Sequence, residues 1–133
     1  MHGIDAIAAV AGASGVPVSL DESAAAPGAL ARRVCEAVCL KVSRCGGITG
    51  LMRTGVLARA VGYELYLAST LDGPLGIAAA LHAATVIEPA RACGLATLGL
   101  FSERADPLPA EHGAIAPPDG AGLGESLASW YGV

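Results

Sequence analysis

A chain of 133 residues, 53% hydrophobic and only 15% charged, can build one domain with a sizeable core and no more. The net charge is −4 and Arg32-Arg33 is the only adjacent basic pair, so the composition argues against a nucleic-acid partner. The most apolar run, residues 75–87, is shorter than the roughly 20 residues of a membrane span, so we expect no membrane partner.

The hydrophobic pattern predicts alternating helices and short apolar strands. We expect helices at residues 4–10, 28–37, 49–61 and 74–86. We expect strands at residues 16–20, 38–42 and 63–68, and a last strand-like segment at 93–101. The strand starts recur every ~22–25 residues, which is the period of βα units and indicates a parallel sheet. Proline, glycine and charge dominate after residue 102, so we expect an irregular tail with a short ordered end at 127–131, anchored by Trp130 and Tyr131.

The cysteines and histidines show no metal-binding pattern. The four cysteines form no C-x-x-C pair, and we expect small, buried, reduced thiols at Cys35, Cys39, Cys45 and Cys93. We interpret the histidines as loop, packing or surface residues: His2, His82 and His112. The N-terminus lacks the pattern of a signal peptide, which favours a cytoplasmic location.

Polar residues follow each predicted strand. They are Asp21, Glu22 and Ser23 after the first strand, Lys41 in the second, and Ser69 and Asp72 after the third. The carboxyl ends of parallel strands meet at one rim, where α/β proteins bind ligands. Such residues can also simply cap the following helices. We favour function for Asp21 and for Lys41, the only lysine, and leave both interpretations open for Ser23 and Ser69.

Gly46 and Gly47 follow the lysine strand and lead into the next predicted helix. They either form a simple turn or let the backbone approach the site closely, with the helix N-terminal amides directed at a substrate anion. Both interpretations stay open on the sequence.

Four segments in order carry a resemblance to a known family. They are residues 20–23 with Asp-Glu-Ser, residues 40–49 with Lys-x-x-x-x-Gly-Gly-Ile, residues 69–82 and residues 92–101. Together they resemble the C-terminal half of the mandelate racemase/muconate lactonizing branch of the enolase superfamily, especially muconate cycloisomerases and o-succinylbenzoate synthases. The resemblance implies an α/β fold: the C-terminal half of a (β/α) TIM-type barrel at residues 1–101, with about four parallel strands, and the irregular tail at residues 102–133.

The resemblance also implies a chemistry. Members abstract a proton α to a carboxylate through an enediolate held on Mg²⁺, in cycloisomerase, racemase or dehydratase reactions of small carboxylates. Lys41 matches a catalytic lysine acting as acid, base or cation, and Asp21 matches a metal ligand. Asp72 stands where the family often has a glutamate and is a second catalytic candidate. The remaining candidates are Glu22, which would orient the metal ligands, and Gly46, Gly47 and Ser69, which would bind substrate.

If Lys41 acts as a base, its pKa must be lowered by burial or by a neighbouring cation such as Arg44. The family's other lysines and metal ligands have no counterpart in this sequence, and the Asp21–Lys41 spacing is short for the family, which predicts a trimmed helix between them. A single carboxylate cannot hold Mg²⁺ against water. We therefore expect a fragment that is inactive alone and that pairs with a second copy or with a complementing N-terminal half. The alternative is a vestigial, non-enzymatic interaction module.

Overall fold

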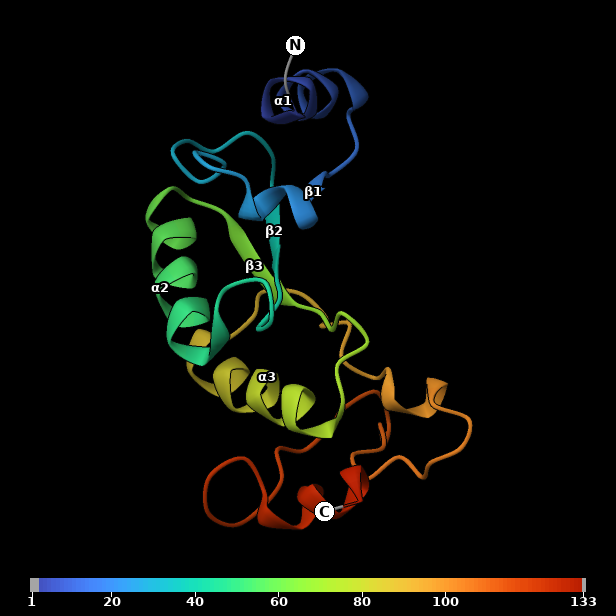
Figure 1. Ribbon diagram of the computed structural model, residues 1–133. Helices are drawn as coiled ribbons and strands as arrows, with labels where there is room; N and C mark the ends of the chain where they lie inside the picture. The colour runs from blue at the N-terminus through green and yellow to red at the C-terminus, as the bar shows by residue number, and fades with distance from the viewer. Residues whose placement is uncertain (1–2, 133) are drawn as a thin grey trace.

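A computed structural model of the protein describes residues 3–132, and Figure 1 shows the order of its elements. The regular elements are α1 (Gly3–Ser14), β1 (Ser19–Leu20), β2 (Ala37–Leu40), α2 (Gly47–Ala60), β3 (Glu64–Leu67) and α3 (Pro74–Ile87). Short 3₁₀ helices are η1 (Glu22–Ala25), η2 (Leu98–Leu100) and η3 (Glu125–Tyr131). None of the helices within residues 3–132 has the length and apolarity that a membrane crossing requires.

The strands form one parallel sheet in the order β1-β2-β3, which confirms the predicted parallel sheet. In register, Leu20 lies opposite Val38, and Cys39 lies opposite Tyr66. The predicted fourth strand is reduced to one parallel bridge between Ala68 and Gly94. Gly94, at the bridge, has no side chain to pack on the sheet, which weakens the strand at this point.

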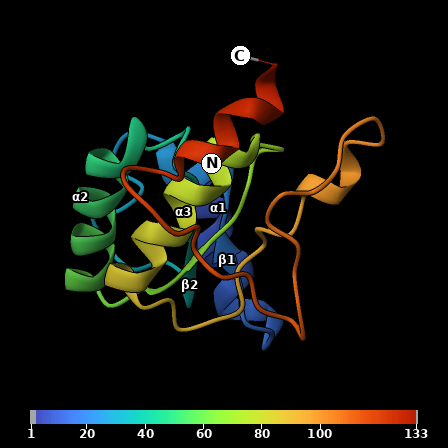
Figure 2. The ribbon, with the colours of Figure 1, turned by 90° about the horizontal axis from the view of Figure 1, so that it is seen from below.

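One face of the sheet carries the apolar core. Alternate residues of β2 and β3 point to this face and are buried: Val38, Leu40, Leu65 and Leu67. Helices α2 and α3 cover it, whereas residues 98–106 lie on the opposite side of the molecule (Figures 1 and 2). Gly55 of α2 faces the sheet, and a Cβ there would make an ordinary contact with Leu65 Cδ1 at 3.6 Å.

The helix expected at residues 28–37 is wrong. The chain forms turns after η1 and then runs extended into β2, which begins at Ala37. Gly28 has a φ of 76°, a left-handed conformation that stops a helix. The Tyr63 hydroxyl accepts a hydrogen bond from Val34 N at 2.9 Å and donates to Arg32 O at 3.0 Å, which holds the extended segment in place.

The tail contains an ordered end, as expected. Trp130 lies in η3, donates from Nε1 to Ala105 O at 3.1 Å, and packs edge-on against Phe101 with ring centroids 5.4 Å apart. The predicted role of Trp130 as an anchor is thereby confirmed. The domain boundary at residue 102 stays a prediction.

The histidines differ in their surroundings. His82 lies in α3, and its Nε2 is buried and has no hydrogen-bond partner among the described residues. His112 lies in a loop with a φ of 51°, whereas His2 lies outside the described residues.

Candidate active site

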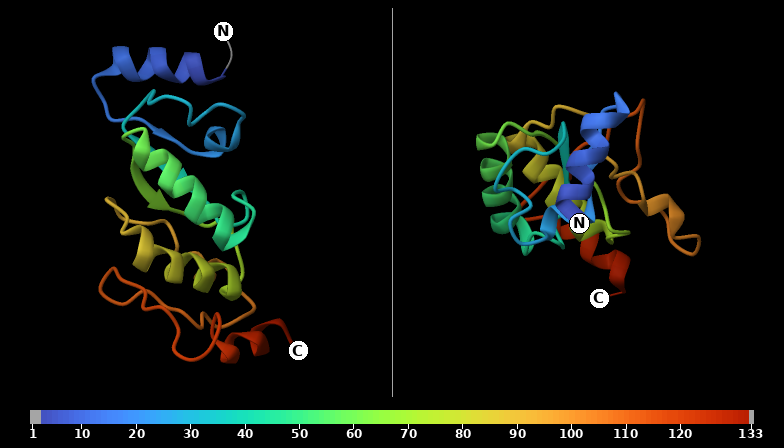
Figure 3. Two further views of the ribbon diagram at one scale, coloured as in Figure 1. Left: turned by 90° about the vertical axis from the view of Figure 1, so that its left-hand side faces the viewer. Right: turned by 90° about the horizontal axis from the view of Figure 1, so that it is seen from above.

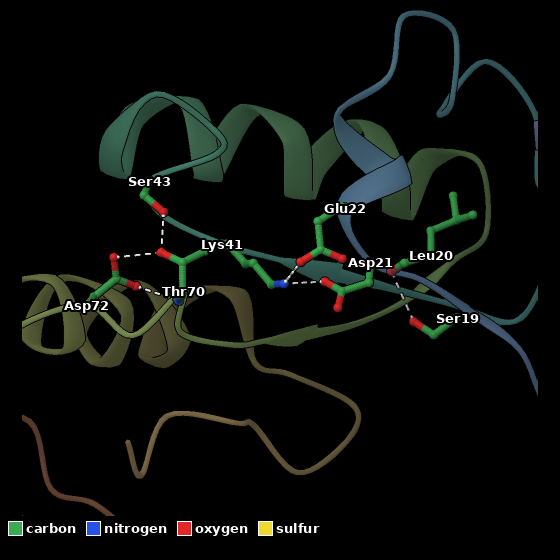
Figure 4. Close-up of polar contacts among 8 residues, drawn as sticks. All are labelled: Ser19, Leu20, Asp21, Glu22, Lys41, Ser43, Thr70 and Asp72. Atoms are coloured by element: carbon green, nitrogen blue, oxygen red, sulfur yellow. Dashed lines mark hydrogen bonds and ion pairs between the residues drawn. The ribbon is translucent and has the colours of Figure 1, made fainter. Parts of the chain in front are cut away.

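Lys41 is the charged side chain that the described part of the fold buries, with 8% of its surface exposed. It follows β2 directly, at the carboxyl end of the sheet. Its Nζ lies 2.5 Å from Asp21 Oδ1 and 2.6 Å from Glu22 Oε1, so one ammonium group joins two carboxylates (Figure 4). Both carboxylates face solvent, with 51% of the Asp21 side chain and 65% of the Glu22 side chain exposed. The charge of the buried ammonium group is therefore neutralised by two carboxylates that remain hydrated.

The parallel register brings these groups together. Because Leu20 of β1 lies opposite Val38 of β2, the residues that follow both strands leave the sheet at the same end. The chain then turns into η1, where Ala24 N donates to Asp21 O at 2.9 Å. The meeting of Asp21 and Lys41 at one rim is confirmed.

The charges set the protonation state of Lys41. Hydrogen bonds to Asp21 and Glu22 raise the pKa of Lys41 above its ordinary value of 10.5, outweighing the opposite effect of burial. The bond from Lys41 in turn lowers the pKa of Glu22 below its ordinary value of 4.5. Lys41 is therefore an ammonium ion at neutral pH. The lowered pKa that a lysine base requires is not present in this arrangement, because the neighbours of Nζ are carboxylates rather than Arg44.

These shifts predict the pH dependence of the cluster. The depressed pKa of Glu22 means that its stabilising contribution is complete above pH 4.5 and is lost as the pH falls below it. The raised pKa of Lys41 means that its contribution is complete below pH 10.5 and is lost as the pH rises through the higher folded value. We expect the difference in unfolding midpoint between wild type and Lys41→Met to be flat from about pH 6 to 9 and to change at both ends. A difference that varied between pH 6 and 9 would contradict the ion cluster.

Asp72 belongs to a second polar cluster. Its carboxylate accepts hydrogen bonds from Thr70 N and Thr70 Oγ1, both at 2.9 Å, and Thr70 Oγ1 is also 2.9 Å from Ser43 Oγ. Figure 4 shows this cluster apart from Lys41, and no hydrogen bond or ion pair within residues 3–132 joins Asp72 to Lys41. Asp72 thus holds the loop after β3, and its catalytic role stays a prediction.

Ser69 closes the same loop. Its Oγ accepts a hydrogen bond from Asp72 N at 2.9 Å and another from Thr97 Oγ1 at 3.0 Å. The residue before α3 is Gly73, and no side chain caps that helix. Ser69 therefore ties the loop to the segment after Gly94 instead of capping a helix. The sequence did not predict that Thr97 contacts Ser69. The signal available for it was a single hydroxyl residue within the last apolar segment.

Gly46 and Gly47 adopt φ values of 79° and 86°, which favour glycine strongly. A Cβ on either would meet nothing within 4 Å, so the backbone conformation requires these glycines and crowding does not. The crowded position is Gly50, where a Cβ would overlap the carbonyl oxygen of Cys45. The substrate-binding role of Gly46 and Gly47 stays a prediction.

A pocket of about 200 Å³ lies beside the ion cluster. Its lining includes Asp21, Glu22, Cys39, Lys41 and Arg44. Burial and the charge of Asp21 raise the pKa of Cys39 to about 11, which keeps this thiol neutral. All four cysteines are free, as expected, but Cys45 and Cys93 are only half-buried.

Residues 1–130 match the family model described as enolase C-terminal domain-like. The chain belongs to this family. Muconate cycloisomerase 1 of Rhodococcus opacus is 35% identical over 120 residues, which cover 84% of this chain and 32% of that protein. The o-succinylbenzoate synthase of Mycobacterium ulcerans is 37% identical over 118 residues, covering 81% and 35%. The chain therefore spans about a third of the length of these relatives.

Solved structures agree with this enolase-superfamily assignment. The L-Ala-D/L-Glu epimerase from Bacillus subtilis superposes with a TM-score of 0.77 at 25% identity, covering 91% of this chain and 35% of that one. A muconate lactonizing enzyme from Mycobacterium smegmatis, complexed with muconolactone, gives 0.77 at 26% identity, covering 93% and 37%. The fold is thus the C-terminal part of an enolase-superfamily TIM-type barrel, as the sequence predicted.

Enolase-superfamily enzymes generally use Mg²⁺. Mg²⁺ needs near-octahedral oxygen coordination, and the described residues contain no group of three or more His, Cys, Asp or Glu side chains that could hold a metal. Asp21 and Glu22 are paired with Lys41. The residues present do not by themselves fit the ion, so a metal site of this family would need ligands from outside residues 3–132.

Proposed function

We propose that this chain supplies the C-terminal part of the active site of a mandelate racemase/muconate lactonizing-type enzyme acting on a small carboxylate. The observation that carries the proposal is Lys41, buried at the carboxyl ends of parallel strands and held between Asp21 and Glu22. The 35% identity of this chain to muconate cycloisomerase 1 favours a cycloisomerase-type reaction over a racemase reaction. A cytoplasmic location is part of the proposal.

Lys41 would act as a cation and proton donor. Removing a proton α to a carboxylate places a second negative charge on the substrate, and a fixed ammonium group in a pocket stabilises that charge as it forms. The raised pKa of Lys41 suits this role, since the group stays protonated at neutral pH. It could serve as a base only after both carboxylates had been drawn away from Nζ.

The site would be completed by other residues, and we propose that the chain is inactive without them. A complementing N-terminal half of the barrel could supply the remaining metal ligands and the first acid-base lysine. A second copy of the chain could close a barrel but would only duplicate Asp21 and Lys41. The chemistry therefore favours the complementing half as partner, with Mg²⁺ as cofactor of the completed site.

A fusion protein tests this proposal. The segment of the Rhodococcus opacus muconate cycloisomerase 1 that precedes the matched region would be joined to this chain. We expect Mg²⁺-dependent muconate turnover by the fusion and none by the isolated chain. A folded fusion that binds Mg²⁺ but exchanges no α-proton on any carboxylate tested would favour the non-enzymatic module. Sedimentation of the isolated chain would show whether a second copy pairs with it.

A further inference from the structure

The C-terminal 3₁₀ helix η3 docks on the start of α3 through Tyr131. The Tyr131 hydroxyl accepts a hydrogen bond from Leu75 N, in the first turn of α3, at 3.2 Å. A Cβ on Gly73 would overlap this hydroxyl. Gly73 has φ −70° and ψ 175°, which any residue adopts, so glycine is needed there for space and not for conformation. Figure 3 shows η3, in red, against that end of α3.

Tyr131 is itself held in place. Its ring packs edge-on against Trp130, with centroids 5.1 Å apart, and the Arg104 guanidinium lies 4.8 Å from the Trp130 ring centroid. Leu127 of the same helix is buried. The phenol therefore reaches Leu75 from an anchored segment and not from a loose end.

The docked turn leads directly to the loop that carries Asp72. A Cβ on Gly76 would lie only 2.7 Å from Asp72 Cβ, so Asp72 packs tightly on the first turn of α3. The Asp72 carboxylate also holds Thr70 N, as described above. A shift of this turn would thus be transmitted through Asp72 to Thr70 and the rim.

We propose that Tyr131 is a positioning residue that fixes the rim loop, residues 69–73, by docking η3 on the first turn of α3. This proposal rests on the proposed function only in taking the rim, at the carboxyl ends of the strands, as the active site. Amide hydrogen exchange tests the docking without any turnover, so failure of one proposal is distinguishable from failure of the other.

Four variants of the full chain test the docking. Tyr131→Phe removes only the hydroxyl, and Gly73→Ala inserts a methyl group where that hydroxyl lies. Tyr131→Ala and the double variant Gly73→Ala/Tyr131→Ala complete a thermodynamic cycle. Amide hydrogen exchange at Thr70 reports on the loop, exchange at Leu65 in β3 reports on the core, and the emission of Trp130, the only tryptophan, reports on η3.

We expect Thr70 exchange to become about fivefold faster in Tyr131→Phe and in Gly73→Ala, which corresponds to the loss of one hydrogen bond. Leu65 exchange should not change, and Trp130 emission should shift in Gly73→Ala. In the Tyr131→Ala background, Gly73→Ala should have no further effect, because the atom that it would displace is gone. Ser129→Ala is the matched control, since Ser129 Oγ donates to Ser126 O within η3 itself.

Three results would overturn the proposal. Unchanged Thr70 exchange in both Tyr131→Phe and Gly73→Ala would mean that η3 does not position the loop. An equal effect of Gly73→Ala in both backgrounds would mean that Gly73 is required for a reason other than Tyr131. Faster exchange at Leu65 as well as Thr70 would mean that η3 supports global stability and has no specific effect on the rim.

Discussion

Replacing Lys41 with methionine in the active fusion should lower turnover by at least about 10³-fold, which is about 4 kcal/mol of transition-state stabilisation. Methionine keeps an unbranched side chain of similar length in the buried position but removes the charge and the transferable proton. Steady-state kinetics with muconate would measure the loss. Arginine at this position should not restore activity, because its wider guanidinium cannot replace a compact ammonium group.

Arg44→Gln is the matched control for this prediction. Arg44 lines the same pocket as Lys41 but makes no ion pair with Asp21 or Glu22. We expect its loss to change turnover by less than about tenfold, since no charge at the ion cluster is removed. Equal losses from the two substitutions would indicate a diffuse electrostatic effect and would argue against a specific role for Lys41.

The same Lys41→Met substitution should leave the isolated chain folded. Removing one partner of a buried ion pair is costly when it leaves an unpaired charge in the interior. Here the two carboxylates left behind, Asp21 and Glu22, are solvent-exposed and can be hydrated. We expect the free energy of unfolding to change by less than about 1 kcal/mol at pH 7. This separation of activity from stability would distinguish a functional Lys41 from a structural one.

Gly50→Ala should lower the free energy of unfolding by about 2–4 kcal/mol. Gly50 lies in α2, and a Cβ there would overlap the Cys45 carbonyl oxygen and lie 2.8 Å from its carbonyl carbon. Both atoms are backbone, so the turn between Lys41 and α2 would have to move. Urea denaturation of the isolated chain would measure the change.

Gly12→Ala is the matched control for Gly50→Ala. Gly12 also lies in a helix, α1, but a Cβ there would meet nothing within 4 Å. We expect this substitution to be neutral or stabilising by up to about 1 kcal/mol, because alanine favours helix more than glycine does. Equal free energies of unfolding for the two variants would contradict the close approach of the Cys45 carbonyl group to Gly50.

Much of the fold was predictable because its pattern is local. The spacing of apolar segments indicated βα units, and the parallel sheet then brought Asp21 and Lys41 to one rim. Pro74 marked the start of α3, since proline suits the first turn of a helix. The family resemblance followed from four motifs in order and is confirmed by the match over residues 1–130.

Other features depended on contacts between segments distant in the sequence. The apolar residues of 28–37 suggested a helix, but Tyr63 holds this segment extended from 29 residues away. The pKa of Lys41 rises because the turn into η1 places Asp21 and Glu22 on its Nζ, in preference to Arg44.

The sequence alone therefore determined the parallel strands and the rim on which Lys41 lies, because hydrophobic spacing marks the buried strand segments and the polar residues that follow them. The tertiary structure decided what Lys41, Asp72 and Tyr131 contact, because hydrogen-bond partners depend on where the chain returns in space.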